Sequence, residues 1–221
     1  MDDLSLLQLN VDITFTYDAR GRMLLSNEPL ASARRPAPRL WLGRTALGNV
    51  IRFRADIPDA LARRLTSLAD DDSALRVLLA QDAPIESESS GPEYRFPESI
   101  ALAPDAIAIT ESNRDAARET FPWLYDEVAD WQPCFAVLRD GQAVSICFSS
   151  RIGARACAAG VETLAEFRGR GYASAVTAAW GAAVRDTGRI PLYGTSRDNP
   201  ASQAVARHLE LMQFASTAAW T

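Results

Sequence analysis

Hydrophobic and polar positions in the second half of the chain follow a regular series of strand and helix spacings. An alanine-rich stretch over 172–186 has the spacing of a long helix, and Gly188 is suited to end it. Shorter helices are expected over 112–130 and from Asp198 or Asn199 to about residue 212. Short apolar runs predict strands over 106–110, 134–139, 142–149, 156–164, 192–195 and 213–220. Strands and helices that alternate in one series predict an α/β or α+β fold with a mixed sheet.

The first half of the chain has the pattern of many short elements. Alternating apolar and polar residues over 11–17 predict a half-buried strand, which a turn at 18–21 joins to a strand at 23–25. A hairpin is predicted over 40–53, after a proline-containing loop at 29–38. Two amphipathic helices follow, and their apolar sides are Leu61, Leu65 and Leu68 in the first and Leu75, Leu78 and Leu79 in the second.

Residues 82–98 have the composition of a linker. They are rich in Pro, Gly, Ser and Glu, and no other stretch of the chain has this bias. We therefore predict a boundary at this point. It divides the chain into an N-terminal α+β region, residues 1–93, and a second domain, residues 94–221.

Composition narrows the classes of function. Acidic residues outnumber basic ones 28 to 23, so there is no basic surplus to bind nucleic acid. All 23 basic residues are arginine, which excludes Schiff-base and lysine-general-base chemistry. With His208 as the single histidine, we expect no metal site. The acidic N-terminus and the lack of a run of about 18 apolar residues predict a cytoplasmic protein without membrane contact.

The predicted strands at 134–139 and 142–149 flank Asp140-Gly141, a dipeptide typical of a two-residue hairpin turn. In the register that such a turn sets, Cys134 faces Cys147. A redox bridge and a pair of reduced, half-buried thiols are both compatible with this register. The odd total of three cysteines favours free thiols.

The segment over 161–173 carries the clearest signal of chemistry. A strand ends, the chain turns through Gly169 and Gly171, and a long helix begins. The start of a helix leaves backbone N–H groups unpaired, and together with the helix dipole these groups bind phosphate or pyrophosphate. Arg168 and Arg170 add positive charge beside them. The sequence therefore predicts an anion-binding loop.

Two other interpretations of this loop stay open. The same residues are compatible with a plain strand-to-helix turn that carries solvated arginines. A Rossmann nucleotide site needs G-x-G-x-x-G and a later acidic residue, whereas this loop offers only Gly169-Arg170-Gly171. The P-loop pattern is excluded because it needs a lysine.

Arg168-x-x-Gly171-x-Ala173 resembles the R/Q-x-x-G-x-G/A acetyl-CoA loop of the GNAT N-acetyltransferases. The resemblance continues through Trp180 and the segment over 191–207, and it is strong over about 156–212. It implies a GNAT-like fold, a mostly antiparallel sheet flanked by helices, which would extend back to about residue 94 and follow an extra N-terminal α+β region. It also implies N-acetyl transfer with acetyl-CoA as co-substrate.

The resemblance also implies where the cofactor lies. The loop amides would hold the pyrophosphate, the strand before the loop would pair with the pantetheine arm, and the helix start at 199–202 would lie beside the thiol. Asn199 is equally explained as a plain helix N-cap. The cofactor-binding residues predicted in this way are Thr163, Leu164, Arg168, Gly169, Arg170, Gly171, Tyr172, Ala173, Asn199 and Ser202.

Glu162 is the predicted general base for direct attack of an amine on the thioester. It shares a strand face with Leu164, and the alternative is an exposed strand carboxylate without a role; Glu166 is the reserve. Many family members carry a tyrosine as general acid four residues after the helix-start serine, where this chain has Ala206. His208 is interpreted either as a replacement acid or, with more weight, as a structural histidine.

The acceptor is expected to be a small-molecule or peptide amine. Trp123, Tyr125 and Trp131 are candidates to line its site, although aromatic residues more often belong to a core. The main alternative to an enzyme is a non-catalytic acyl-CoA-binding or sensing module, and a nucleotide-binding protein is a third. Residues 1–93 would close the acceptor side, mediate a homodimer or enlarge the core.

Overall fold

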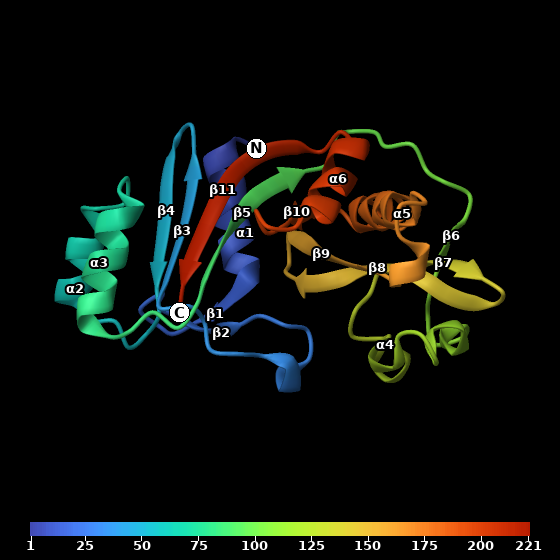
Figure 1. The fold of residues 1–221 in the computed structure, drawn as a ribbon, viewed down its shortest axis with the longest axis horizontal. Coiled ribbons are helices and arrows are strands. Elements are labelled where there is room, and N and C mark those ends of the chain that lie inside the picture. The colour runs from blue at the N-terminus through green and yellow to red at the C-terminus, as the bar shows by residue number, and fades with distance from the viewer.

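A nine-stranded sheet runs through the computed structural model, which describes all 221 residues (Figure 1). Its strands are β3 (Leu40–Thr45), β4 (Gly48–Phe53), β5 (Glu88–Arg95), β6 (Ala106–Ala108), β7 (Cys134–Arg139), β8 (Gln142–Ile152), β9 (Ala156–Thr163), β10 (Ile190–Gly194) and β11 (Met212–Trp220). The order across the sheet is β4-β3-β11-β5-β10-β9-β8-β7-β6. Only β9 and β10 pair in parallel. A separate two-stranded sheet joins β1 (Phe15–Tyr17) to β2 (Met23–Ser26).

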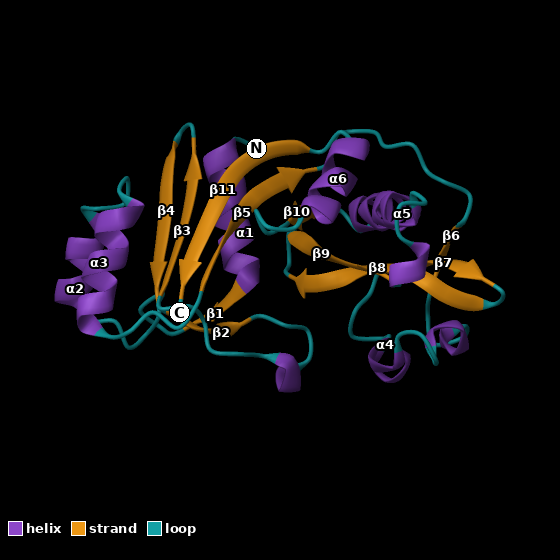
Figure 2. Cartoon of the chain, viewed as in Figure 1, coloured by secondary structure: helices purple, strands orange, loops and turns teal.

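Helices cover both faces of the sheet, which confirms the predicted α+β class (Figure 2). One face carries α5 (Tyr172–Asp186) and α6 (Pro200–His208), and the other carries α1 (Asp3–Thr14) and α4 (Pro122–Glu127). At the far end, α2 (Asp59–Thr66) and α3 (Asp72–Asp82) pack on β3, β4 and β11. Short 3-10 helices occur at Ala31–Ala33, Arg114–Ala117 and Ala165–Phe167. No helix has the length and apolar character needed to cross a bilayer.

The prediction of a strand from residue 11 was wrong, because residues 3–14 form α1. Asp2 caps the helix by accepting a hydrogen bond from the Ser5 backbone N–H at 2.8 Å. Its buried side includes Leu7 and Val11, which are one helical turn apart. The alternation after residue 11 is real only in β1, over 15–17. A short alternation of apolar and polar residues therefore could not distinguish the end of a helix from a strand.

Residues 88–95, predicted as part of a linker, instead form β5 in the interior of the sheet. This strand pairs with β10 on one side and β11 on the other. The boundary placed at residues 93/94 therefore falls within a strand. In Figure 1, β5 lies beside β11, so segments from both halves of the sequence alternate in one sheet.

The hairpin of β7 and β8 forms around Asp140-Gly141, as predicted, and both turn residues have positive φ. The predicted register was wrong, because a β-bulge after Val137 shifts the pairing. Cys134 consequently lies opposite Phe148, and Cys147 lies opposite Phe135. The two thiols pack in different hydrophobic clusters, and all three cysteines are free and buried.

Candidate functional site

The parallel strands β9 and β10 separate after a short paired stretch. Three residue pairs join them, and Ala158 with Leu192 is the last. Beyond this pair, β9 keeps its pairing with β8 as far as Thr163, and β10 keeps its pairing with β5 as far as Gly194. The two strands therefore leave a split in the sheet.

A cleft of about 1240 Å³ occupies this split and continues past the start of α5. Every predicted cofactor-binding residue except Arg170 lines it, and so does Glu162. The lining of the cleft also includes Phe121, Trp123, Val161, Tyr193, Gly194 and His208. The structure thus brings one strand end, one loop and two helix starts together around a single opening.

The loop before α5 presents a row of unused backbone N–H groups. The Phe167 N–H donates to the Leu164 carbonyl at 3.0 Å, and the Arg168 N–H donates to the Ala165 carbonyl at 3.3 Å. The six amides over 169–174 donate to no protein acceptor, and the first N–H after them, that of Ala175, bonds the Gly171 carbonyl. Six free donors at the N-terminus of a 15-residue helix form a strong anion-binding surface.

Two glycines set the shape of this loop through their backbone conformation. Gly169 has φ +73° and Gly171, the residue that begins α5, has φ +81°. A Cβ at either position would meet no atom within 4 Å, so within the protein these glycines are required by positive φ and not by crowding. A Cβ at these positions would therefore limit only the close approach of a bound anion.

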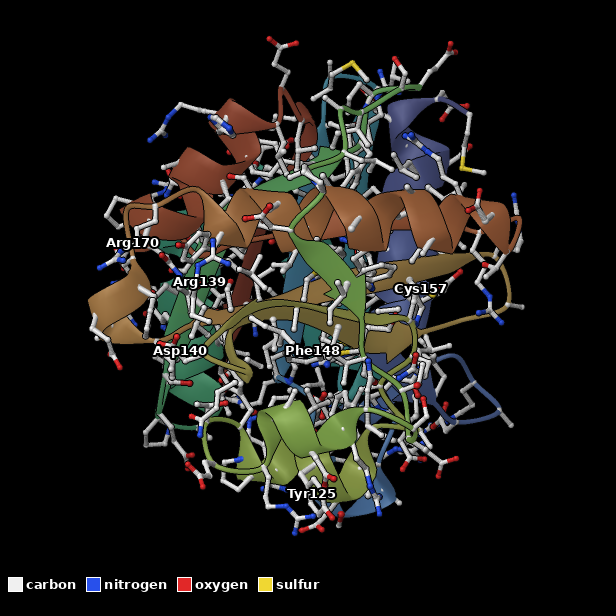
Figure 3. All side chains as sticks on the ribbon, turned by 90° about the vertical axis from the view of Figure 1, so that its right-hand side faces the viewer. Tyr125, Arg139, Asp140, Phe148, Cys157 and Arg170 are labelled. Atoms are coloured by element: carbon white, nitrogen blue, oxygen red, sulfur yellow. The ribbon has the colours of Figure 1, made fainter.

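The two loop arginines lie differently. Arg168 donates from Nε to the Thr163 carbonyl at 3.3 Å and lines the cleft. Arg170 donates to the Glu166 carbonyl at 3.2 Å, stacks over Phe167 and stays outside the cleft lining. Figure 3 shows Arg170 at the outer end of α5. Of the two, Arg168 is therefore the one placed to neutralise an anion in the cleft.

Backbone groups of β9 point alternately to the two neighbouring strands. The Leu164 N–H donates to the Val144 carbonyl at 3.0 Å, so Leu164 is occupied within the sheet. Val161 and Thr163 therefore turn their backbone groups toward the split. The sequence predicted Thr163 and Leu164 as the residues that pair with the pantetheine arm, whereas the free edge of the strand consists of Thr163 and Val161. Because backbone groups alternate along a strand, counting back two residues from Thr163 would have identified Val161.

Glu162 projects into the cleft on the α4 side of the sheet, beside Trp123. Partial burial raises the pKa of this carboxyl group, and the neighbouring Trp123 side chain opposes the shift. No ion pair holds Glu162, whereas Glu166 lies on the exposed loop outside the cleft lining. Glu162 is thus the carboxylate of the pair that faces the split.

The start of α6 closes the opposite wall of the cleft. Asn199 accepts the Ser202 backbone N–H at 3.0 Å, so it is the N-cap of this helix. The Ser202 hydroxyl lies 2.6 Å from the hydroxyl of Tyr193, which sequence reasoning did not single out. Burial raises the pKa of Tyr193 to about 12.

The remaining candidate residues are divided between core, surface and cleft. Ala206 is fully buried, so it offers the cleft no group, whereas His208 is exposed and lines it, against the expectation of a structural histidine. Trp123 lines the cleft. Trp131 belongs to the core, where its ring packs edge-on against the ring of Trp123. Tyr125 lies on the outer side of α4, between two arginines (Figure 3).

A split parallel strand pair with an anion-binding loop at its mouth has room for a long phosphorylated ligand between the two strands. A family model described as GNAT acetyltransferase matches residues 125–213, which contain this strand pair and loop. Residues 125–213 are therefore similar to the GNAT acetyltransferase family, and the match supports a transferase domain over this part of the chain.

Two solved structures that are described as GNAT-related proteins have a similar fold. An acetyltransferase from Colwellia psychrerythraea aligns with TM-score 0.51 and 13% identity over 77% of this chain and 75% of that chain. A GCN5-related N-acetyltransferase-like protein from Streptococcus suis aligns with TM-score 0.51 and 16% identity over 84% and 85%. A GNAT-family protein from Novosphingobium aromaticivorans, at 16% identity and TM-score 0.47, is covered over 65% of its length, and 62% of this chain is aligned. A search of curated proteins finds no significant match.

Proposed function

We propose that the protein is an acyl-CoA-dependent N-acetyltransferase. The amine nitrogen attacks the thioester carbonyl carbon directly, an N–C bond forms, the C–S bond breaks, and the CoA thiolate leaves. The products are an N-acetylated amine and CoA. No residue of the chain forms a covalent intermediate in this scheme.

The observation that carries the proposal is the row of six unused amides over 169–174 at the mouth of the split. An anion with two phosphoryl groups satisfies several such donors at once, and Arg168 lies beside them. The exposed backbone edge of Val161 and Thr163 then offers an extended amide-containing arm the hydrogen bonds of a missing strand. Acetyl-CoA has both parts.

Glu162 is the proposed general base. A lysine-like amine has a pKa near 10, so it must lose a proton before it can attack. Glu162 faces the split and takes that proton directly or through a water. The thiolate has a reference pKa near 8.5 and leaves without an obligatory acid, which accommodates Ala206.

The alternative function is a non-catalytic acyl-CoA-binding or sensing module. The observation that favours it is the fully buried Ala206 at the position where the resemblance places an acid. A small-molecule or peptide amine as acceptor, a homodimer and a cytoplasmic location remain predictions.

Calorimetric titration with acetyl-CoA and with ATP, followed by thiol release with a panel of amines, tests the proposal. Preferential acetyl-CoA binding together with amine-dependent thiol release is the expected result. Tight acetyl-CoA binding without turnover would favour the sensing module, and preferential ATP binding would refute both.

A further inference from the structure

Glu93 belongs to an interior strand of the sheet, and no cationic side chain forms an ion pair with its carboxylate. It lies on β5, and its partners in the neighbouring strands are Gly194 of β10 and Ala215 of β11. Thr217 donates a hydrogen bond to its Oε1 at 3.2 Å, and the Asn10 side chain of α1 lies close enough to favour the ionised form. Neither partner carries a charge.

The carboxylate leans away from its own strand, over β10. A Cβ built on Gly194 would lie 2.6 Å from Glu93 Oε2, so the carboxylate takes the place of the side chain that Gly194 lacks. Gly194 is exposed and lines the cleft. Glu93 itself does not line the cleft, but its carboxylate contacts Gly194, a lining residue, at the level where β10 ends.

Glu93 and Glu162 lie on the same face of the sheet. Ala158 and Leu192 pack against α1, and Glu162 and Gly194 follow them at even spacing along β9 and β10. Glu162 therefore lies on the β9 side of the split, and the Glu93 carboxylate lies over β10 on the other side, on the face that carries α1 and α4. Phe121 and Trp123 add apolar surface on the α4 side.

Glu93 is half-buried, and a carboxylate that is withdrawn from water without a cation is costly; such groups commonly belong to a binding site. Burial raises the pKa of Glu93 to about 7, although Thr217 and Asn10 oppose the shift. A ligand that carries a positive charge would remove this cost by pairing with the ionised form.

We propose that Glu93 binds a second cationic group of the acceptor, so that the preferred acceptors are small diamines or polyamines. One nitrogen lies beside Glu162 and is acetylated, and the other ammonium group pairs with Glu93 across the split. The alkyl chain between them packs on Trp123 and Phe121. This inference rests on the proposed function, because it names the substrate class of the same cleft.

The test compares Glu93→Gln with Glu88→Gln, a control at the other end of the same strand, where Glu88 pairs with Arg76 and contacts no cleft residue of β10. Glutamine keeps the shape of the side chain and a carbonyl acceptor for Thr217, but it removes the charge. Thiol release is measured with a series of α,ω-diamines and with monoamines of equal chain length. We expect Glu93→Gln to lower kcat/KM for the best diamine by about 10- to 100-fold and to leave the monoamine within about twofold, as for loss of one charged hydrogen bond.

Gly194→Ala supplies an independent variant, because its methyl group would displace the carboxylate without changing its charge. Like Glu93→Gln, this variant should lower kcat/KM for diamines relative to kcat/KM for monoamines. An equal loss for diamine and monoamine in Glu93→Gln, or a wild type without diamine preference, would overturn the ammonium site.

Direct binding separates this inference from the proposed function. Diamine binding to the CoA-loaded protein is measured by calorimetry, without turnover. Glu93-dependent diamine binding without thiol release from any amine would contradict the transferase and keep the ammonium site. Turnover of monoamines and diamines at equal rates, without Glu93-dependent binding, would keep the transferase and refute the ammonium site.

Discussion

The hydroxyl groups of Tyr193 and Ser202 lie 2.6 Å apart and join β10 to the first turn of α6. The Tyr193 hydroxyl also lies 3.2 Å from the Ser202 backbone carbonyl. Both residues line the cleft, so this contact fixes the distance between the wall made by α6 and the edge of the split.

Tyr193→Phe removes this link without emptying the space. We expect the free energy of unfolding to fall by about 1 kcal/mol, the usual contribution of one hydrogen bond, and KM for acetyl-CoA to rise. Chemical denaturation and initial rates measure the two effects. Unchanged KM with lowered stability would assign the contact to the fold alone.

Glu162→Gln should lower kcat by about 100- to 10,000-fold, the range for loss of a general base, and leave the affinity for acetyl-CoA unchanged. Since a base acts only when deprotonated, and burial raises the pKa of Glu162, the wild-type rate should fall on the acid side at a pH above the ordinary carboxyl range. Glu166→Gln is the matched control, and it should retain the wild-type rate. A normal rate in Glu162→Gln would remove it from the mechanism.

Gly171 and Gly188 flank α5, and their φ values are nearly equal, +81° and +78°. A Cβ added at either position would meet no atom within 4 Å. Alanine at either position should therefore lower stability by a similar amount, about 1–2 kcal/mol. Only Gly171→Ala should also weaken acetyl-CoA binding, because only Gly171 lies in the anion loop. Equal affinities of the two variants, by calorimetry, would count against that loop as the binding site.

Glu93 should make the stability of the free protein depend on pH. Its folded pKa of about 7 lies above the ordinary 4.5, so folding favours the protonated form and stability falls as pH rises between these values. The loss should reach about 2–3 kcal/mol by about pH 8 and be absent in Glu93→Gln. Urea denaturation at about pH 5 and about pH 8 measures it. Parallel pH profiles for wild type and variant would mean that Glu93 is not buried as described.

Local signals predicted the part of the fold that local residues determine. The helix over 172–186, the turn at Asp140-Gly141 and the N-cap Asn199 depend on contacts a few residues apart, and all three are present. The anion loop belongs to the same group, since its free amides follow from a helix start after two glycines with positive φ.

Non-local pairing decided what sequence reasoning missed. Residues 88–95 have a linker's composition, yet Gly91 is needed because the Thr195 carbonyl would lie 1.7 Å from a Cβ there. A close contact between segments that are far apart in the sequence produces no local residue pattern from which it could be predicted. Glu93 was overlooked for the same reason, because its importance depends on β10 and α1 packing around it.

Amide NMR during titration with acetyl-CoA is the decisive measurement, because it reports on the individual N–H groups that we propose bind the diphosphate. We predict that the largest shifts and the strongest added protection from hydrogen exchange fall on residues 169–174, with smaller changes at Val161 and Thr163. Saturable binding of acetyl-CoA that leaves the amides of 169–174 unchanged would contradict the account.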